Sequence, residues 1–172
     1  MGAPLNLPDT LSDGVIQLDR PTIADADAHV AGEDREMRLR FESPNPDTPA
    51  TSEHTRGVFA GWIAARAAGG PKLVYALRDG SGQLVGGCEM RRVSEREAAV
   101  SYWVYPAFRR RGFGARALTL LCAAALETPG LKHLVAHIDA DNLASRRTAE
   151  RAGLDTVGVV EDRETDGSPR PD

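Results

Sequence analysis

Short apolar runs separated by polar turns indicate several β-strands in the first two thirds of the chain. We predict strands at residues 14–18, 72–78, 83–93 and 98–105. Residues 79–82, with the sequence Asp-Gly-Ser-Gly, favour a hairpin turn between the second and third of these strands. The last three strands are therefore expected to form an antiparallel meander.

Longer stretches with a helical spacing of apolar residues separate and follow these strands. Residues 41–50 are rich in proline and can only be a loop, because proline fixes the backbone and lacks a donor. The stretch after residue 112 is apolar on most sides, which is typical of a helix buried against a sheet. We predict helices at about residues 21–39 (capped by Thr22 or Asp25), 52–68, 112–127 and 142–152, and further strands at 134–138 and 156–160.

The strand–helix–strand order after residue 98 implies a parallel pair with a right-handed crossover. The expected fold class is α/β (α+β): a mixed, mostly antiparallel central sheet with one parallel pair, flanked by about four helices. We expect residues 1–172 to form a single domain. Within it, residues 1–13 would be a loose N-terminal arm and residues 165–172 a C-terminal tail.

Composition and charge narrow the classes of function. Hydrophobic residues make up 41% and charged residues 27%, as in ordinary soluble globular proteins, and the net charge of −4 argues against general nucleic-acid binding. No apolar run reaches the roughly 18 residues that a membrane span needs. Cys88 and Cys122 lie in apolar segments without a secretory signal before them, which favours buried thiols in a reducing cytoplasm. We expect no nucleic-acid or membrane partner and no metal.

The most distinctive chemistry lies between the strand at 98–105 and the helix after it. Arg109, Arg110 and Arg111 run directly into residues 112–114, Gly-Phe-Gly. Glycines remove the side chains that would keep an anion from the backbone. A helix start leaves about four N–H groups unpaired and carries a partial positive charge. The pattern predicts a turn that binds phosphate or pyrophosphate, with charge-assisted contacts from the arginines.

This turn and a second motif resemble a known family. Arg109, Gly112 and Gly114 match the fixed positions of R/Q-x-x-G-x-G/A, the acetyl-CoA-binding motif of the GNAT superfamily of N-acetyltransferases. Residues 142–145 (Asn-Leu-Ala-Ser) and 150–154 (Glu-Arg-Ala-Gly-Leu) are similar to a segment of the branch that contains the ribosomal-protein N-terminal acetyltransferases. Two motifs at the right separation make the resemblance specific.

The resemblance implies a GNAT-type fold, with a splayed parallel pair, and acetyl-CoA as the co-substrate. The pyrophosphate would be held by N–H groups of the turn, and the pantetheine arm would pair with the edge of the central strand. A backbone N–H there would polarise the thioester carbonyl. The cofactor-binding residues implied are Trp103, Val104, Arg109, Arg110, Arg111, Gly112, Phe113, Gly114, Ala115 and Asn142.

The same resemblance suggests candidate catalytic groups. Related enzymes carry a general base at central-strand positions that are here Ala98 and Val100, which cannot accept a proton. Glu89 on the neighbouring strand is the first candidate base and Glu97 the second; otherwise Glu89 is a solvated strand residue. Ser145 is the candidate acid for the departing thiolate, or a helix residue that only contacts the cofactor or caps a backbone group.

The implied acceptor is a primary amine of a protein N-terminus or a small molecule, attacking directly in a ternary complex. Its pocket would be shaped by the N-terminal helices and the loop at 41–50, where Glu33, Asp34 and Glu36 could attract a cationic amine or form a solvated face. Family members usually add a strand after the turn that follows Glu164. That strand is absent here, follows residue 172, or is supplied by a partner, which makes a homodimer possible.

Two other functions fit parts of the sequence. Residues 112–117 also match the dinucleotide-binding pattern G-x-G-x-x-A, with Asp139 after the next strand. Pro106 and the arginines before the first glycine, and the preceding antiparallel meander, argue against a doubly wound dinucleotide fold. The second alternative is a non-catalytic acyl-CoA-binding or sensor module of the same fold, since the central strand carries no base.

Overall fold

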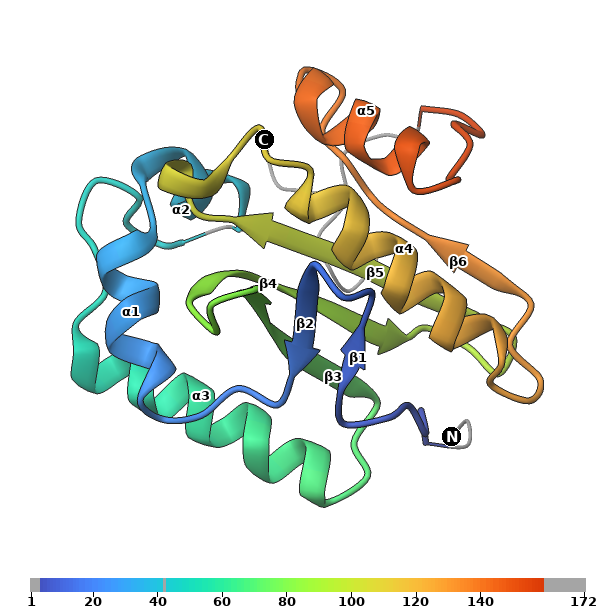
Figure 1. Cartoon of the computed structure of the whole chain (residues 1–172), viewed down its shortest axis with the longest axis horizontal. Helices are drawn as coiled ribbons and strands as arrows, with labels where there is room; N and C mark the ends of the chain where they lie inside the picture. The colour runs from blue at the N-terminus through green and yellow to red at the C-terminus, as the bar shows by residue number, and fades with distance from the viewer. Residues whose placement is uncertain (1–3, 42, 160–172) are drawn as a thin grey trace.

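The computed structural model describes residues 4–41 and 43–159, which form one six-stranded sheet in the order β1-β2-β3-β4-β5-β6 (Figure 1). All neighbours pair antiparallel except β5 and β6, which are parallel. The strands are β1 (Leu11–Ser12), β2 (Ile16–Asp19), β3 (Lys72–Asp79), β4 (Leu84–Arg92), β5 (Glu97–Val104) and β6 (His133–Val135). The expected mixed sheet, its meander and its parallel pair are confirmed.

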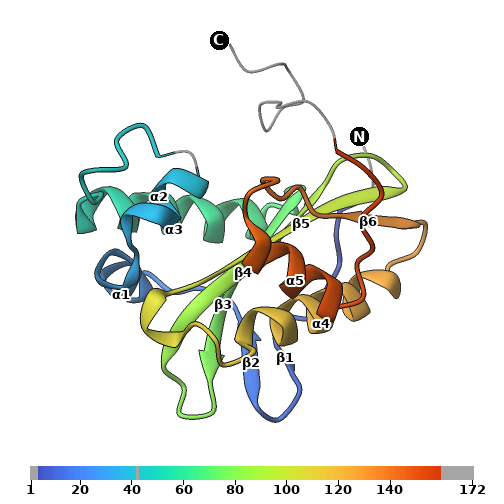
Figure 2. The same cartoon turned by 90° about the horizontal axis from the view of Figure 1, so that it is seen from above.

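Helices cover both faces of this sheet (Figure 2). We call the face covered by α4 and α5 the α4 side, and the face covered by α1, α2 and α3 the α3 side. The helices are α1 (Asp25–Gly32), α2 (Arg35–Arg40), α3 (Ser52–Ala67), α4 (Phe113–Leu126) and α5 (Leu143–Arg151), with a 3₁₀ turn at Pro106–Phe108. Among the described residues, no helix combines the length and apolar character that a bilayer span requires.

The main core fills the α4 side. Every second residue of β5, including Ala98 and Val100, packs there against Leu118 and Leu121 of α4, and all four are at most 3% exposed. A smaller core of Met37, Val74, Trp103 and Tyr105 lies on the α3 side. The alternation of β5 therefore sends Tyr102 to one face and Trp103 to the other.

The prediction of a loose N-terminal arm is wrong for the part of residues 1–13 that the structure describes. Leu5 and Leu7 are buried in the main core, and Leu11–Ser12 pairs with β2 as an edge strand. Apolar side chains spaced two apart can cover a core without forming a long strand, and two prolines hide this from a pattern search.

The helix predicted over residues 21–39 is divided into α1 and α2. Asp34 has an extended backbone, and its side chain accepts from the Met37 N–H at 2.8 Å, which caps α2. The new helix start redirects α2 toward β5. The predicted helices at 52–68, after Gly112 and at 142–152 are confirmed.

The C-terminal strands differ from the prediction. β6 ends at Val135, and His137, within the strand predicted at 134–138, is exposed. Residues 156–159 form no strand, and Val157 and Val159 are almost fully exposed. Residue 160 and the expected tail at 165–172 lie outside the described residues.

Candidate active site

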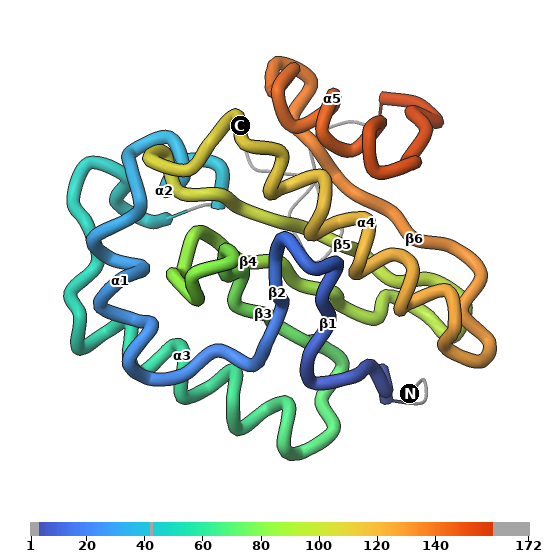
Figure 3. The backbone as a smooth tube through the Cα atoms, viewed as in Figure 1, coloured from blue at the N-terminus to red at the C-terminus, as the bar shows by residue number. Residues whose placement is uncertain are grey.

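The edge of β5 that faces β6 is open over its second half. β6 pairs with β5 only from Glu97 to Ala99, after which the chain turns away toward α5 (Figure 3). On the opposite edge, the Tyr105 N–H donates to the Val85 carbonyl of β4. Because backbone groups of successive strand residues point to alternate edges, the N–H and C=O of Val104 face the opening. Val104, rather than Trp103, is placed to offer a backbone N–H there.

The turn after β5 has the backbone of an anion site. Arg110 and Gly112 both adopt left-handed conformations, with φ of 64° and 77°. Such turns direct neighbouring N–H groups toward one side. The first N–H of this region to find a helical acceptor is that of Arg116, which donates to the Gly112 carbonyl. Within the described part of the chain, the N–H groups of residues 110–115 donate to no backbone acceptor.

The two glycines of the turn serve different purposes. A Cβ placed on Gly112 would meet nothing within 4 Å, so this residue is glycine because of its backbone conformation and leaves space above the helix start. A Cβ on Gly114 would lie 2.8 Å from the Tyr102 ring and 3.3 Å from Thr148 Cγ2. Gly114 therefore lets α4 approach β5 and α5, a role that the motif alone does not reveal.

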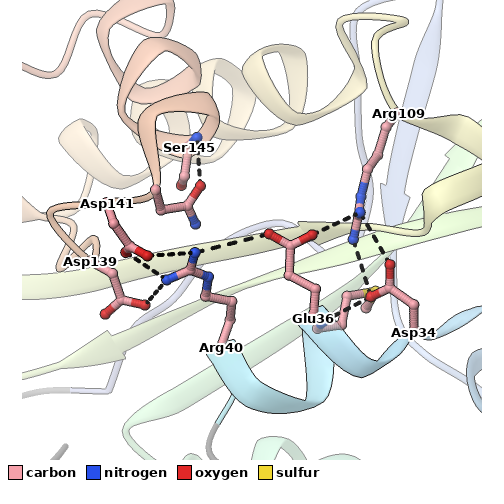
Figure 4. Close-up of polar contacts among 9 residues, drawn as sticks. Asp34, Glu36, Arg40, Arg109, Asp139, Asp141 and Ser145 are labelled. Atoms are coloured by element: carbon pink, nitrogen blue, oxygen red, sulfur yellow. Dashed lines mark hydrogen bonds and ion pairs between the residues drawn. The ribbon is translucent and has the colours of Figure 1, made fainter.

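The three arginines do not point together into the turn. Arg109 Nε donates to the Val104 carbonyl at 3.2 Å, and its Nη1 lies 3.2 Å from Asp34 Oδ2 (Figure 4). Arg111 donates to the Ala107 carbonyl and lies over the Phe108 ring, while Arg110 is exposed. In this structure the Arg109 side chain ties the turn to α2, and phosphate contacts from the three guanidinium groups stay a prediction.

Asn142 and Ser145 lie together at the start of α5. Asn142 Oδ1 accepts from the Ser145 N–H at 3.1 Å, so Asn142 caps the N-terminus of α5. The cap uses the side-chain oxygen, which leaves its Nδ2 as the group that can donate to a ligand. Ser145 Oγ lies 3.0 Å from the Tyr102 hydroxyl, a pairing that sequence reasoning missed. The alternation of β5 could have suggested it, since Tyr102 faces the α4 side.

Glu89 lies on the α3 side, in a pair with Lys72. Lys72 Nζ is 2.6 Å from Glu89 Oε2, and the two side chains are partly exposed. Two residues earlier, Gly87 lies opposite Trp103, and a Cβ there would overlap the indole ring. Trp103 is therefore a buried wall between β4 and α3. Glu97, the second candidate base, lies at the far end of β5 from Trp103.

Side chains of α2 and of the β6–α5 connection join across the opening. Arg40 Nη1 lies 2.6 Å from Asp139 Oδ2 and 2.9 Å from Asp141 Oδ1 (Figure 4). The hydrogen bond from Arg40 lowers the pKa of Asp141. We call Arg40, Asp139 and Asp141 the ionic bridge. Sequence reasoning missed it because its members are about a hundred residues apart.

A second polar group on the α3 side was also missed. His29 Nδ1 lies 2.8 Å from the Tyr105 hydroxyl, and its ring packs edge-on against Phe59 and Trp103. Burial lowers the pKa of His29. Glu33 Oε2 lies 3.7 Å from His29 Nε2, and burial raises the pKa of Glu33, although Arg38 acts in the opposite direction. The region predicted to hold the acceptor thus mixes buried charge with aromatic walls.

Comparison with known proteins places this arrangement in a family. Residues 16–155 match the family described as the acetyltransferase (GNAT) domain. No curated protein matches the sequence. The matched range contains both motifs, the open edge of β5 and the whole turn.

Solved structures share the fold at low sequence identity. A Vibrio cholerae structure, described as a ribosomal-protein-serine acetyltransferase, has a TM-score of 0.77 at 19% identity, covering 96% of this chain and 95% of that one. The microcin C7 self-immunity acetyltransferase MccE, in complex with acetyl-CoA and AMP, has a TM-score of 0.73 at 17% sequence identity. The match covers 92% of this chain and 88% of that one. Mycobacterium smegmatis RimJ, in complex with a CoA disulfide, has a TM-score of 0.66 at 21% sequence identity. The match covers 86% of this chain and 76% of that one.

Proposed function

The chain belongs to the GNAT acetyltransferase family, and from that premise we propose that it acetylates the α-amino group of a protein N-terminus. It is an acetyl-CoA-dependent N-acetyltransferase, with acetyl-CoA as the co-substrate that supplies the activated acetyl group. The identity of the acceptor is the part that we propose.

The observation that carries the proposed mode of acetyl-CoA binding is the junction of an open strand edge with a helix start. The Val104 N–H faces the opening beside β5, and the turn at residues 110–115 offers N–H groups to an anion. These two features are spaced along one continuous segment, as a long ligand with a diphosphate at one end requires. We propose that the turn holds the diphosphate, that Asn142 Nδ2 donates to the pantetheine arm, and that Val104 N–H polarises the thioester carbonyl.

We propose Glu89 as the general base and Ser145 as the donor to the leaving sulfur. Glu89 shares the α3 side with Trp103, where the amine would arrive, while Ser145 lies on the α4 side with Tyr102. The amine nitrogen bonds to the acetyl carbon, its proton goes to Glu89, and the carbon–sulfur bond breaks with its electron pair on sulfur. The reaction is then a direct transfer in a ternary complex.

Chemistry and structural neighbours support an α-amino acceptor. An α-amino group has a pKa of about 7.7–8.0, whereas a lysine amine has about 10.4, so the former needs little help at neutral pH. Glu89 forms an ion pair with Lys72, which fits a base that has to take a proton only from an α-amino group. Among the structures of similar fold, RimL is described as a ribosomal L7/L12 α-N-protein acetyltransferase and is 18% identical.

The test compares acceptor classes with one donor. Acetyl-CoA is supplied with peptides that carry a free N-terminus, with Nα-acetylated peptides that contain lysine, and with polyamines and aminoglycosides, and thiol release is followed. We expect kcat/KM for free N-termini to exceed that for lysine side chains by at least about tenfold at neutral pH. A preference for small amines would contradict the proposed acceptor. Binding of CoA without transfer to any amine would instead favour the non-catalytic module.

Glu89→Gln tests the base. We expect kcat to fall by about 100-fold for lysine-type amines and by less for α-amino groups, since a general base contributes about that much. Lys72→Met is the matched control, because it breaks the same ion pair but keeps the carboxylate. Equal rates for Glu89→Gln and the parent across about pH 6–9 would remove Glu89 from the mechanism.

We further propose a cytoplasmic location. Cys88 and Cys122 are both free and buried, and burial raises the pKa of Cys122 to about 11. Buried thiols of this kind need no oxidising compartment. A homodimer remains a prediction, which sedimentation of the purified protein would test.

A further inference from the structure

We propose that Tyr102 is a positioning residue that turns the Ser145 hydroxyl toward the leaving sulfur. This inference rests on the proposed function and adds a residue that neither motif contains. Tyr102 lies on β5 and Ser145 on α5, and their hydroxyl oxygens are 3.0 Å apart. The pair borders the opening between β5 and the β6–α5 connection, where the thioester is proposed to lie.

The direction of this hydrogen bond follows from the chemistry of the two hydroxyls. A phenol is a stronger acid than an aliphatic alcohol and is therefore the better donor. The alternative acceptor for Tyr102, the Ser145 carbonyl, is at 3.5 Å, longer than the 3.0 Å to Oγ. A serine hydroxyl has a single proton. When Ser145 Oγ accepts a hydrogen bond from Tyr102, the Ser145 proton is directed away from Tyr102. In the opening, the acceptor available to this proton is the sulfur of the bound thioester.

Both partners are held in place by independent contacts. The Tyr102 ring is pressed by the N-terminal turn of α4, since a Cβ on Gly114 would be 2.8 Å from it. Ser145 is fixed through its backbone, because its N–H donates to the Asn142 side chain at 3.1 Å. Gly114 and Asn142 belong to the two sequence motifs, so Tyr102 connects the motif at the diphosphate end with the motif at the thiol end.

The proton balance of the step is simple. As the carbon–sulfur bond breaks, its electron pair stays on sulfur, and the Ser145 proton moves toward that sulfur. If the proton transfers fully, the Tyr102 proton moves to Ser145 Oγ, and water returns a proton to the tyrosine oxygen. The proton that Glu89 took from the amine goes back to water, so the number of protons is unchanged.

A double-mutant cycle of Tyr102→Phe and Ser145→Ala tests the inference. Tyr102→Phe keeps the ring against Gly114 and removes only the hydroxyl. We expect kcat to fall by about 5- to 10-fold, the value of one neutral hydrogen bond, with the CoA dissociation constant within about twofold of the parent. In the Ser145→Ala background, Tyr102→Phe should have no further effect, because the group that it orients is gone.

Tyr75→Phe is the matched control. The Tyr75 hydroxyl also donates a hydrogen bond, to the Pro8 carbonyl at 2.6 Å, but it lies on β3, two strands from β5, and its partners are Pro8 and Arg66 rather than Ser145. We expect it to leave kcat unchanged.

The outcomes separate the two proposals. Parental kcat for Tyr102→Phe, or effects of the two substitutions that multiply in the double mutant, would overturn the role of Tyr102 while leaving the acetyltransferase intact. A changed CoA affinity that accounts for the whole loss would assign Tyr102 to packing and also overturn it. A parent protein that binds CoA but releases no thiol with any acceptor would contradict the proposed function itself.

Discussion

The two sides of the sheet build their parts of the site in different ways. On the α4 side, the proposed diphosphate site is a continuous run of backbone from Val104 to Ala115. On the α3 side and across the opening, the side chains come from distant segments: Arg40 reaches Asp139 and Asp141, Arg109 reaches Asp34, and His29 reaches Tyr105. The first part depends on main-chain geometry and the second on side-chain pairing.

This difference explains why the diphosphate site on the α4 side can be recognised as a sequence motif. A site made of N–H groups constrains only the residues that set the backbone, namely the glycines and the helix start. A site made of paired charges constrains residue types at positions that the chain places together only after folding. The same difference predicts how each side responds to substitution.

Gly112→Glu should have the largest effect, on the α4 side. A Cβ has open space there, so the side chain would place a carboxylate over the helix start, where the diphosphate is proposed to bind. We expect the CoA dissociation constant to rise by at least about 100-fold, measured by calorimetry, with a folded circular-dichroism spectrum.

Gly153→Glu is the control for this substitution. Gly153 also has a positive φ and open space around it, but it lies after the C-terminal end of α5. Unchanged CoA affinity in Gly112→Glu would remove the diphosphate from this turn.

Gly114→Ala should destabilise the fold more than Gly112→Ala, which separates the two glycines of the motif. The new methyl group at 114 would be forced against the Tyr102 ring, an overpacking that costs about 1–3 kcal/mol. At 112 only the left-handed backbone is penalised, by about 1 kcal/mol. Denaturant unfolding gives both values, and the reverse order would mean that Tyr102 can move aside.

Arg40→Ala breaks the ionic bridge and should have a smaller effect on stability. The Asp139 and Asp141 side chains are 51% and 76% exposed, so the ionic bridge is screened and contributes about 1 kcal/mol or less to stability. We expect a small drop in Tm and a change in the salt dependence of kcat/KM for the acceptor. Arg56→Ala, which breaks an exposed pair with Asp27, is the control of equal charge. Identical salt dependence in both variants would leave the bridge without a role in the reaction.

The smallest expected effect is a pH dependence from His29. Burial lowers its folded-state pKa below the unfolded value of about 6.5. As the pH falls below about 6.5, the unfolded chain binds a proton that the folded chain does not, so stability decreases. The Tyr105 hydroxyl and Glu33 face the ring, and the raised pKa of Glu33 acts in the opposite direction only at lower pH.

His29→Gln should flatten that slope. The free energy of unfolding is measured by denaturant at about pH 7.5, 6.5 and 5.5, a window around the histidine pKa. A slope equal to that of the parent would show that another group is responsible.

Much of the structure around the proposed diphosphate site was predicted from local sequence patterns. The hairpin at Asp79–Gln83, the α4 start behind Gly112 and the start of α5 after Asn142 all appear where local turn chemistry and helix signals predicted them. The helix break at Asp34 and the burial of Leu5 and Leu7 were not predicted. A charged run and a proline-rich segment show no clear periodicity of apolar residues.

The sequence by itself determined the mixed sheet, its parallel pair and the turn that marks the GNAT family, because these rest on residues close together in the chain. Only the tertiary structure decided that Arg109 turns to Asp34, that Glu89 contacts Lys72, and that Tyr102 meets Ser145. The physical reason is that backbone conformation is set by neighbours in sequence, whereas the partner of a side chain is set by which elements pack together.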